Sequence, residues 1–263
     1  MSTKERRRFL EEQCLKAEKH EYLYHVTTMQ ALKSIIKHNQ IWLSNLSSVN
    51  DMEEKARIDW KEYIDSTYVF CTTYDKELSP HHWDEYGNKA DGVIIGIKNG
   101  KFWENDIVFL DENNKPILDE KYIVNKNMDI IPIKSSFYIH SLKLVEVSYE
   151  GISEKSKIVE KQDGGMFVFP GLAAVTKSRE GISVKTHKPR EWWTEKEVRL
   201  VIVISNRLSK NDVWYPKRIA VKLNKSFWDS MQIRFSPSMS NEKKRECKSE
   251  LVELLTGYDV TIE

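Results

Sequence analysis

The sequence predicts an α+β fold, and three observations support this prediction. About eight segments show the alternation or the continuous apolar runs of β-strands, whereas helical patterns gather near the start of the chain and at its end. A chain of 263 residues can bury a full hydrophobic core without disulfide bonds. Its 40% hydrophobic content argues against disorder. We expect an N-terminal helix over residues 1–20 and a single α+β domain over residues 21–263.

Composition and charge narrow the class of protein. The 41 basic and 40 acidic residues leave a net charge of +1, which argues against a dedicated electrostatic nucleic-acid binder. No run approaches 18 apolar residues, so we expect no membrane-spanning helix and no membrane partner. The charged first ten residues lack the apolar stretch of a secretory signal, and the three cysteines lie far apart. These features favour a cytoplasmic protein with reduced thiols.

The first half of the chain switches between helical and extended patterns. An amphipathic pattern predicts a helix over residues 3–20, and an aromatic, alternating stretch predicts a strand at residues 21–27. Thr27, three residues before Gln30, matches a capping box, so we expect the next helix to begin there. The later elements expected are a strand at 41–44, a helix at 52–63, a strand at 68–72, a short helix from Pro80 to Gly87, and a buried strand at 92–97.

The second half is richer in β-leaning segments. Strands are expected near residues 102–110, 122–124, 130–133, 142–147 and 217–223. Residues 151–190 carry glycine and proline breaks and predict a loop with a short helix near 172–177. Residues 192–204 form the clearest strand. Ser240 is expected to open a C-terminal helix whose buried face holds Cys247, Leu251, Leu254 and Leu255.

The strongest candidate for chemistry is Glu195-x-Glu197-x-Arg199 on the clearest strand. Residues two apart on a strand share a face, so two carboxylates and a guanidinium would follow one another at about 7 Å, with Val198 and Leu200 facing the core. Burying three charged groups there costs free energy unless water solvates them, ion pairs neutralise them or the function of the protein requires them. Two interpretations stay open: an edge strand with an ion-pair ladder in solvent, or a functional carboxylate positioned by its neighbours.

A second candidate is His25 with Thr27, at the end of the early strand and just before a helix. The histidine can donate to a ligand hydroxyl, and the free amides at a helix start favour an anionic group. The competing interpretation makes His25 a satisfied core histidine and Thr27 a helix cap.

A third candidate is the short helix that carries Trp83 and Tyr86. These residues are three apart, so they would share one helix face and could stack on a planar ligand or simply bury the helix. His81 and His82 are adjacent and diverge on a helix, so we expect no metal site. Phosphate-loop, dinucleotide-loop and nucleophile-elbow motifs are missing from the sequence.

The order of these motifs resembles the bacterial family labelled domain of unknown function 2971. Cys71-Thr72 and Phe235-Ser236 depart from the family pattern. The segments that carry the resemblance are Tyr24-His25-Val26-Thr27, Ile41-Trp42-Leu43-Ser44, Asn50-Asp51 with Glu53, Phe70-Cys71-Thr72, Leu78-Ser79 with Trp83 and Tyr86-Gly87, residues 92–97, Trp192 with Glu195, Glu197 and Arg199, and residues 233–240.

A more distant similarity is to the ADP-ribosyltransferase superfamily, which has His-x-Thr on an early strand, an aromatic helix in the middle and Glu-x-Glu on a late strand. This resemblance implies mixed, mainly antiparallel sheets that form a split β core with flanking helices. It also implies NAD as co-substrate. Glu197 would be the catalytic carboxylate and Glu195 would orient the nucleophile. The residues that it assigns to NAD are His25 and Thr27 for the ribose, Trp83 and Tyr86 beside nicotinamide, and Arg199 for a carboxylate or the pyrophosphate.

These considerations lead to three functional hypotheses. The leading one is an NAD-using ADP-ribosyltransferase of the bacterial toxin or phage-defence type, which modifies a protein or nucleic-acid acceptor. The alternative is a non-catalytic module of a defence system that senses nucleotides or nucleic acid. A third is a hydrolase in which Asp51 joins Glu195 and Glu197 around a divalent ion. Basic residues in 177–190 would suit a polynucleotide acceptor or an ordinary exposed loop.

Overall fold

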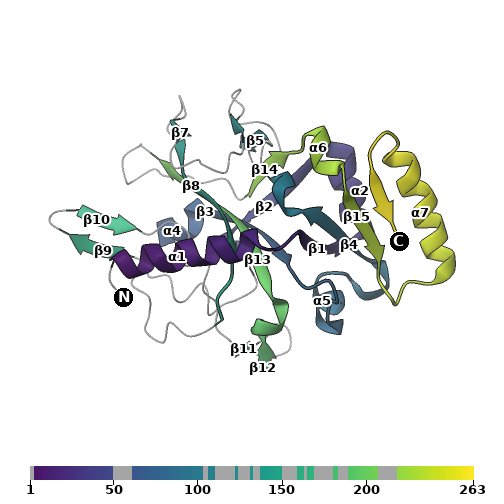
Figure 1. The fold of residues 1–263 in the computed structure, drawn as a ribbon, viewed down its shortest axis with the longest axis horizontal. Helices are drawn as coiled ribbons and strands as arrows, with labels where there is room; N and C mark the ends of the chain where they lie inside the picture. The colour runs from purple at the N-terminus through teal and green to yellow at the C-terminus, as the bar shows by residue number, and fades with distance from the viewer. Residues whose placement is uncertain are drawn as a thin grey trace.

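A twelve-stranded sheet forms the centre of the computed structural model (Figure 1). The model describes residues 3–49, 61–102, 106–109, 122–123, 131–132, 137–149, 159–162, 165–168, 180–182, 189–206 and 218–263. Its described strand pairs are antiparallel apart from β15 with β16, and helices flank the sheet. The fold is therefore mixed α+β with a largely antiparallel open sheet, and the predicted fold class is confirmed at this level.

The described elements follow the predicted order closely in the first half of the chain. The helices are α1 (Thr3–Glu18), α2 (Met29–His38), α4 (Lys61–Ser66), α5 (Pro80–Glu85), α6 (Lys225–Trp228) and α7 (Asn241–Leu254). The strands of the main sheet are β1 (Tyr22–Thr28), β2 (Gln40–Asn45), β3 (Thr67–Thr73), β4 (Gly92–Lys98), β5 (Asp106–Phe109), β6 (Tyr122–Ile123), β7 (Ile131–Pro132), β8 (Phe137–Glu146), β13 (Glu197–Asn206), β14 (Arg218–Lys222), β15 (Met231–Phe235) and β16 (Val260–Ile262). Two hairpins stand apart: β9 (Val159–Gln162) with β10 (Gly165–Val168), and β11 (Glu180–Ile182) with β12 (Pro189–Glu191).

Some predicted elements differ from the structure. The late strand starts at Glu197 and not at Trp192, because Trp192–Glu195 forms a 3₁₀ turn, η5, and Lys196 has a left-handed backbone with φ of 46°. Strand β15 was not among the predicted strands. Leu254 is 43% exposed, whereas Cys247, Leu251 and Leu255 on the same helix are buried as predicted. The predicted helix at 52–63 lies largely outside the described residues, and only its end coincides with α4.

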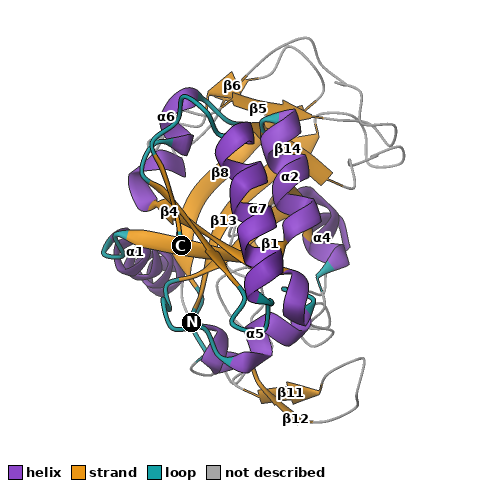
Figure 2. Cartoon of the chain, turned by 90° about the vertical axis from the view of Figure 1, so that its right-hand side faces the viewer, coloured by secondary structure: helices purple, strands orange, loops and turns teal. Residues whose placement is uncertain are grey.

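Strand β13 lies inside the sheet, between β3 and β8. Its even-numbered residues, Val198 to Ile204, belong to the larger core cluster, to which α2 and α7 also contribute. Val201 and Val203 face the opposite side and a smaller cluster, against which α1 packs. Figure 2 shows α2 and α7 side by side in front of the strands. The predicted core face of this strand is confirmed, whereas the edge-strand interpretation of its charged residues is wrong.

The sheet divides at strand β3. One edge of β3 pairs with β13 through seven consecutive residues. The other edge is shared, because β1 pairs with β3 only where Tyr24 meets Thr73, and β2 pairs with it at Val69 and Tyr68. From there β1 leads into β4, β15 and β16, while β2 leads into β14, β5 and β6. On the side of β1 and β2, the edge of β3 at Cys71 therefore has no paired strand, and a pocket opens there.

The described helices include none with both the length and the apolar character needed to cross a membrane.

Candidate functional site

The pocket at the division of the sheet brings together side chains from both halves of the chain. It encloses about 80 Å³, which is smaller than the roughly 300–1,000 Å³ of typical small-ligand sites, so a ligand bound here extends out of the open mouth. The residues that line it are Tyr24, His25, Val26, Cys71, Thr72, Thr73, His82, Tyr86, Glu195 and Glu197. Four of the predicted site residues, His25, Tyr86, Glu195 and Glu197, thus share one cavity.

His25 fills the gap that the diverging strands leave. If the β1–β3 ladder continued beyond Tyr24 and Thr73, Val26 would lie opposite Cys71, but this pair does not form. Instead, Nδ1 of His25 lies 2.9 Å from the carbonyl oxygen of Cys71. A carbonyl only accepts, so Nδ1 carries the proton and Nε2 of the neutral ring is an acceptor. Burial lowers the pKa of His25, and the bond to Cys71 opposes this shift, so the neutral ring is favoured.

Glu197 is the first residue of β13 and is held by a buried ion pair. Its Oε2 accepts from Nη2 of Arg199 at 2.8 Å, and the two residues are only 6% and 1% exposed. Both residues point away from Val198, as the two-residue period of a strand requires. Charges this deeply buried need such a partner, because removing an unpaired charge from water costs roughly several kcal/mol. The carboxylate is therefore fixed at the pocket wall by its own strand.

Glu195 reaches the same pocket from a different element. It ends the η5 turn, so the prediction that it shares a strand face with Glu197 is wrong. The left-handed Lys196 between them redirects the chain, and both carboxylates still line the pocket. The hydroxyl of Tyr86 donates to Oε1 of Glu195 at 2.8 Å, and Nε2 of His81 lies 3.6 Å from the same oxygen.

Two further polar groups lie close to the carboxylates. Nδ1 of His82 is 3.0 Å from the Ser79 hydroxyl oxygen, while its buried Nε2 has no hydrogen-bond partner among the described residues. Burial lowers the pKa of His82, and Glu195 opposes this shift. The hydroxyl of Tyr149 accepts from the backbone N–H of Glu197 at 3.0 Å. Burial, and then the charges of Glu197 and Glu195, raise the pKa of Tyr149.

Three predicted site residues do not line the pocket. Thr27 is buried on β1, and Thr28, not Thr27, caps α2, with Oγ1 accepting from the N–H of Ala31 at 3.2 Å. Trp83 packs against two glycines: a Cβ on Gly92 would lie 2.9 Å from its indole. Arg199 is occupied by Glu197. Asn50, Asp51 and Glu53 lie outside the described residues.

Sequence reasoning missed several lining residues. Tyr24, Thr72 and Thr73 belong to ordinary-looking strand segments, and no spacing distinguishes them from core positions. Cys71 entered the sequence analysis only as a departure from the family pattern, and His82 only as a residue not expected to bind a metal. The signal that would have found them is the pairing of β3 with both β1 and β13, which single-sequence patterns do not contain.

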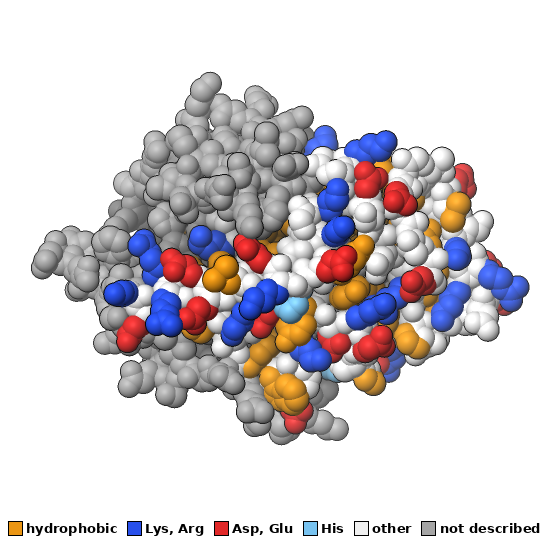
Figure 3. Space-filling model, in the orientation of Figure 1, with side chains coloured by type: hydrophobic (Ala, Val, Ile, Leu, Met, Phe, Trp, Pro, Cys, Tyr) orange, Lys and Arg blue, Asp and Glu red, His pale blue; other side chains and the backbone are white. Residues whose placement is uncertain are grey.

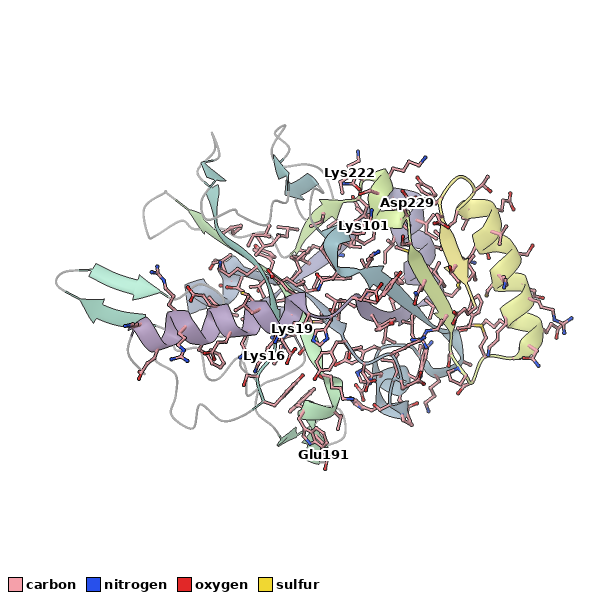
Figure 4. The ribbon with its side chains drawn as sticks, in the orientation of Figure 1. Lys16, Lys19, Lys101, Glu191, Lys222 and Asp229 are labelled. Atoms are coloured by element: carbon pink, nitrogen blue, oxygen red, sulfur yellow. The ribbon has the colours of Figure 1, made fainter. Side chains whose placement is uncertain are left out.

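The described residues do not support a metal or polynucleotide site directly. No group of three or more His, Cys, Asp or Glu side chains placed to hold a metal ion occurs in the described part of the chain. Basic and acidic side chains alternate over the face seen in Figure 3. In Figure 4, Lys16 and Lys19 lie on α1, far from Lys101 and Lys222, which lie near Asp229. Most of the basic segment 177–190 lies outside the described residues.

A second, larger cavity of about 430 Å³ lies between the start of α2 and α7. It contains none of the predicted site residues. Its two lysines are engaged, since Lys33 pairs with Glu250 at 2.5 Å and Lys243 pairs with Asp91. The pocket at β3 is therefore the better candidate.

The fold and site define an α+β protein with an acidic, histidine-containing pocket where its sheet divides. The arrangement offers two fixed carboxylates, a neutral imidazole acceptor and aromatic walls, which suit binding of a polyhydroxylated ligand such as a ribose. No family model matches the chain, and no curated protein or solved structure matches it.

Proposed function

We propose that this protein is an NAD-using enzyme of the ADP-ribosyltransferase type, which transfers ADP-ribose to a macromolecular acceptor. One observation carries the proposal: His25 on an early strand and Glu197 on a late strand flank β3 and line the same pocket, with Tyr86 and Glu195 beside them. A division of the sheet at β3 is also what a split β core requires. The order of the motifs, which resembles that of the ADP-ribosyltransferase superfamily, also supports the proposal.

The residues have distinct roles in the proposed reaction. Nε2 of His25 accepts from a ribose hydroxyl, and the Tyr86 ring flanks nicotinamide. Glu197 accepts a hydrogen bond from the ribose 2′-hydroxyl and stabilises the positive charge that develops at C1′. Arg199 is a positioning residue, because it holds Glu197 and does not reach the pocket.

The bond changes balance without a metal ion. The C1′–N bond breaks, and its electron pair leaves with nicotinamide. A nucleophilic oxygen or nitrogen of the acceptor then forms a bond to C1′, and its proton passes to Glu195. A protein or a nucleic acid in a bacterial toxin or defence system fits the acceptor role.

The test is NAD cleavage by Glu197→Gln. The amide keeps the shape and can still accept from Arg199, but it removes the charge. We expect nicotinamide release to fall about 100- to 1,000-fold, as when one preorganised transition-state group is lost, with little change in NAD binding by calorimetry. Glu253→Gln, on the exposed side of α7, is the matched control. Equal turnover in the two variants would sink the proposal.

One observation favours a nucleotide-sensing module without catalysis. Each carboxylate already has a partner inside the protein, Arg199 for Glu197 and Tyr86 for Glu195. Such a module would bind NAD or a related nucleotide and release no nicotinamide, with or without a cell extract as acceptor. Labelled NAD incubated with an extract distinguishes the two functions, because only the enzyme transfers label to protein or nucleic acid.

A further inference from the structure

Arg234 on β15 lies beside the pocket and forms no ion pair with any described carboxylate. Its guanidinium carbon is 5.3 Å from the centre of the Tyr24 ring, and Tyr24 lines the pocket. Its Nη2 donates to the carbonyl of Lys76 at 2.8 Å, and its buried Nε has no hydrogen-bond partner in the described part of the chain. The guanidinium of Arg234 is thus held in place by an aromatic ring and a carbonyl group, and its charge remains available to bind an anion.

Two other cations close to the pocket are neutralised by carboxylates. Arg199 pairs with Glu197 at 2.8 Å, and Lys196 pairs with Asp75 at the same distance. Burial raises the pKa of Tyr24 and Arg234 opposes this shift, while Tyr22, Glu21 and Glu263 add to it. Neither glutamate forms an ion pair with Arg234 in the described part of the chain. The guanidinium is only half-buried, so an anion from solvent can reach its charge.

The strands place Arg234 on the face of the sheet that also carries Tyr24 and Glu197. One row crosses five strands, from Gln232 through Gly96, Tyr24 and Thr73 to Glu197, so these positions share a face. Arg234 is two residues beyond Gln232 and therefore lies on that same face.

Gly96 makes this arrangement possible. A Cβ there would lie 3.0 Å from Cε1 of Tyr24, so only glycine leaves room for the ring to lean over β4. Arg234 then passes over the ring to the Lys76 carbonyl, in the loop that follows β3.

We propose that Arg234, supported by Tyr24, forms an anion-binding subsite at the pocket mouth that takes the pyrophosphate of the dinucleotide. This rests on the proposed function. The cavity, about 80 Å³, is far too small for a whole dinucleotide, so the phosphates must lie outside it. The resemblance gave Arg199 a carboxylate or the pyrophosphate as partner; in this proposal the pyrophosphate falls to Arg234. Guanidinium donors match phosphate oxygens in pairs.

Calorimetry with three ligands tests the subsite: NAD, ADP, and nicotinamide riboside, which has no phosphate. We expect Arg234→Met to weaken NAD and ADP about 10- to 100-fold, the scale of a hydrogen bond to a charged group, and to leave nicotinamide riboside unchanged. Arg245→Met is the matched control, since Arg245 on α7 also donates to a backbone carbonyl but is exposed. For Arg234→Lys we expect affinities for NAD and ADP between those of the wild type and Arg234→Met, because lysine keeps the charge and loses the paired donors.

The outcomes separate the two proposals. If NAD is cleaved but Arg234→Met binds NAD and ADP like the wild type, the subsite is wrong and the proposed function stands. If the wild type binds ADP through Arg234 but neither binds nor cleaves NAD, the proposed function fails and the subsite stands. Should Arg234→Met fail to fold, salt titration of the wild type decides: affinity for ADP must fall with added NaCl, while affinity for nicotinamide riboside must not. Equal salt dependence would overturn the subsite.

Discussion

The two edges of strand β3 show how one strand can be both scaffold and site. Towards β13 the edge is closed by seven paired residues, and the hydroxyl of Thr72 adds a 2.7 Å bond to the carbonyl of Val198. Towards β1 a single pair forms, and the ring of His25 takes the place of a backbone donor at Cys71. The closed edge fixes Glu197 and Arg199, whereas the open edge leaves space for a ligand. The pocket therefore arises where backbone pairing stops.

The largest effect is expected from breaking the ion pair at the closed edge. Arg199→Met leaves the carboxylate of Glu197 buried without its partner, so the free energy of unfolding should fall by about 3–5 kcal/mol in urea titrations. Replacing both residues by apolar ones should restore much of this loss. The control is Arg8→Met, because the Arg8–Glu12 pair is exposed, at 81% and 48%, and should change stability by less than about 1 kcal/mol. Equal losses in the two single variants would show that the buried pair is not what secures this edge.

Much of the closed edge could be predicted from sequence. The apolar positions of β13 and their two-residue period identified both its core face and the shared direction of Glu197 and Arg199, because the period of a strand is a local property. The C-terminal helix, the short helix at Pro80 and the early strands follow from similarly local signals. Glu195 was misplaced because a 3₁₀ turn and one left-handed residue, Lys196, leave no periodic signature.

The open edge of β3 could not be predicted from local sequence patterns. Which strand pairs with β3, and for how many residues, depends on contacts between segments far apart in the chain. His25 and Glu197 were recognised as polar residues in unusual positions, but their common pocket depends on β3. Arg234 gave no signal, since an arginine on a strand reads as a solvated residue unless the neighbouring Tyr24 and Gly96 are known.

The second effect is a pH dependence that comes from the open edge. Burial holds the pKa values of His25 and His82 below the ordinary 6.5, so below that pH the unfolded chain binds protons that the folded chain does not. Stability from these groups is present above pH 6.5 and is lost as the pH falls, with a slope of up to about 1.4 kcal/mol per pH unit for each group.

Denaturant titrations at several pH values measure this slope. His25→Gln and His82→Gln should each flatten it, while His38→Gln, at the exposed end of α2, should leave it unchanged. An identical slope in all three variants would mean that neither pocket histidine is kept neutral by the fold.

The smallest effect is expected at the bond that Thr72 adds to the closed edge. Thr72→Val keeps the shape and the branched side chain but removes the hydroxyl, so stability should fall by only about 0.5–1.5 kcal/mol. Thr72→Ser keeps the bond to Val198 and is the matched control. Amide exchange distinguishes the two edges: in Thr72→Val the paired amides of β3 and β13 should stay protected, because the seven-residue ladder remains. Faster exchange along the whole of β13 in that variant would show that the closed edge depends on this side-chain bond. The two edges would then differ in their side chains and not in the number of paired residues.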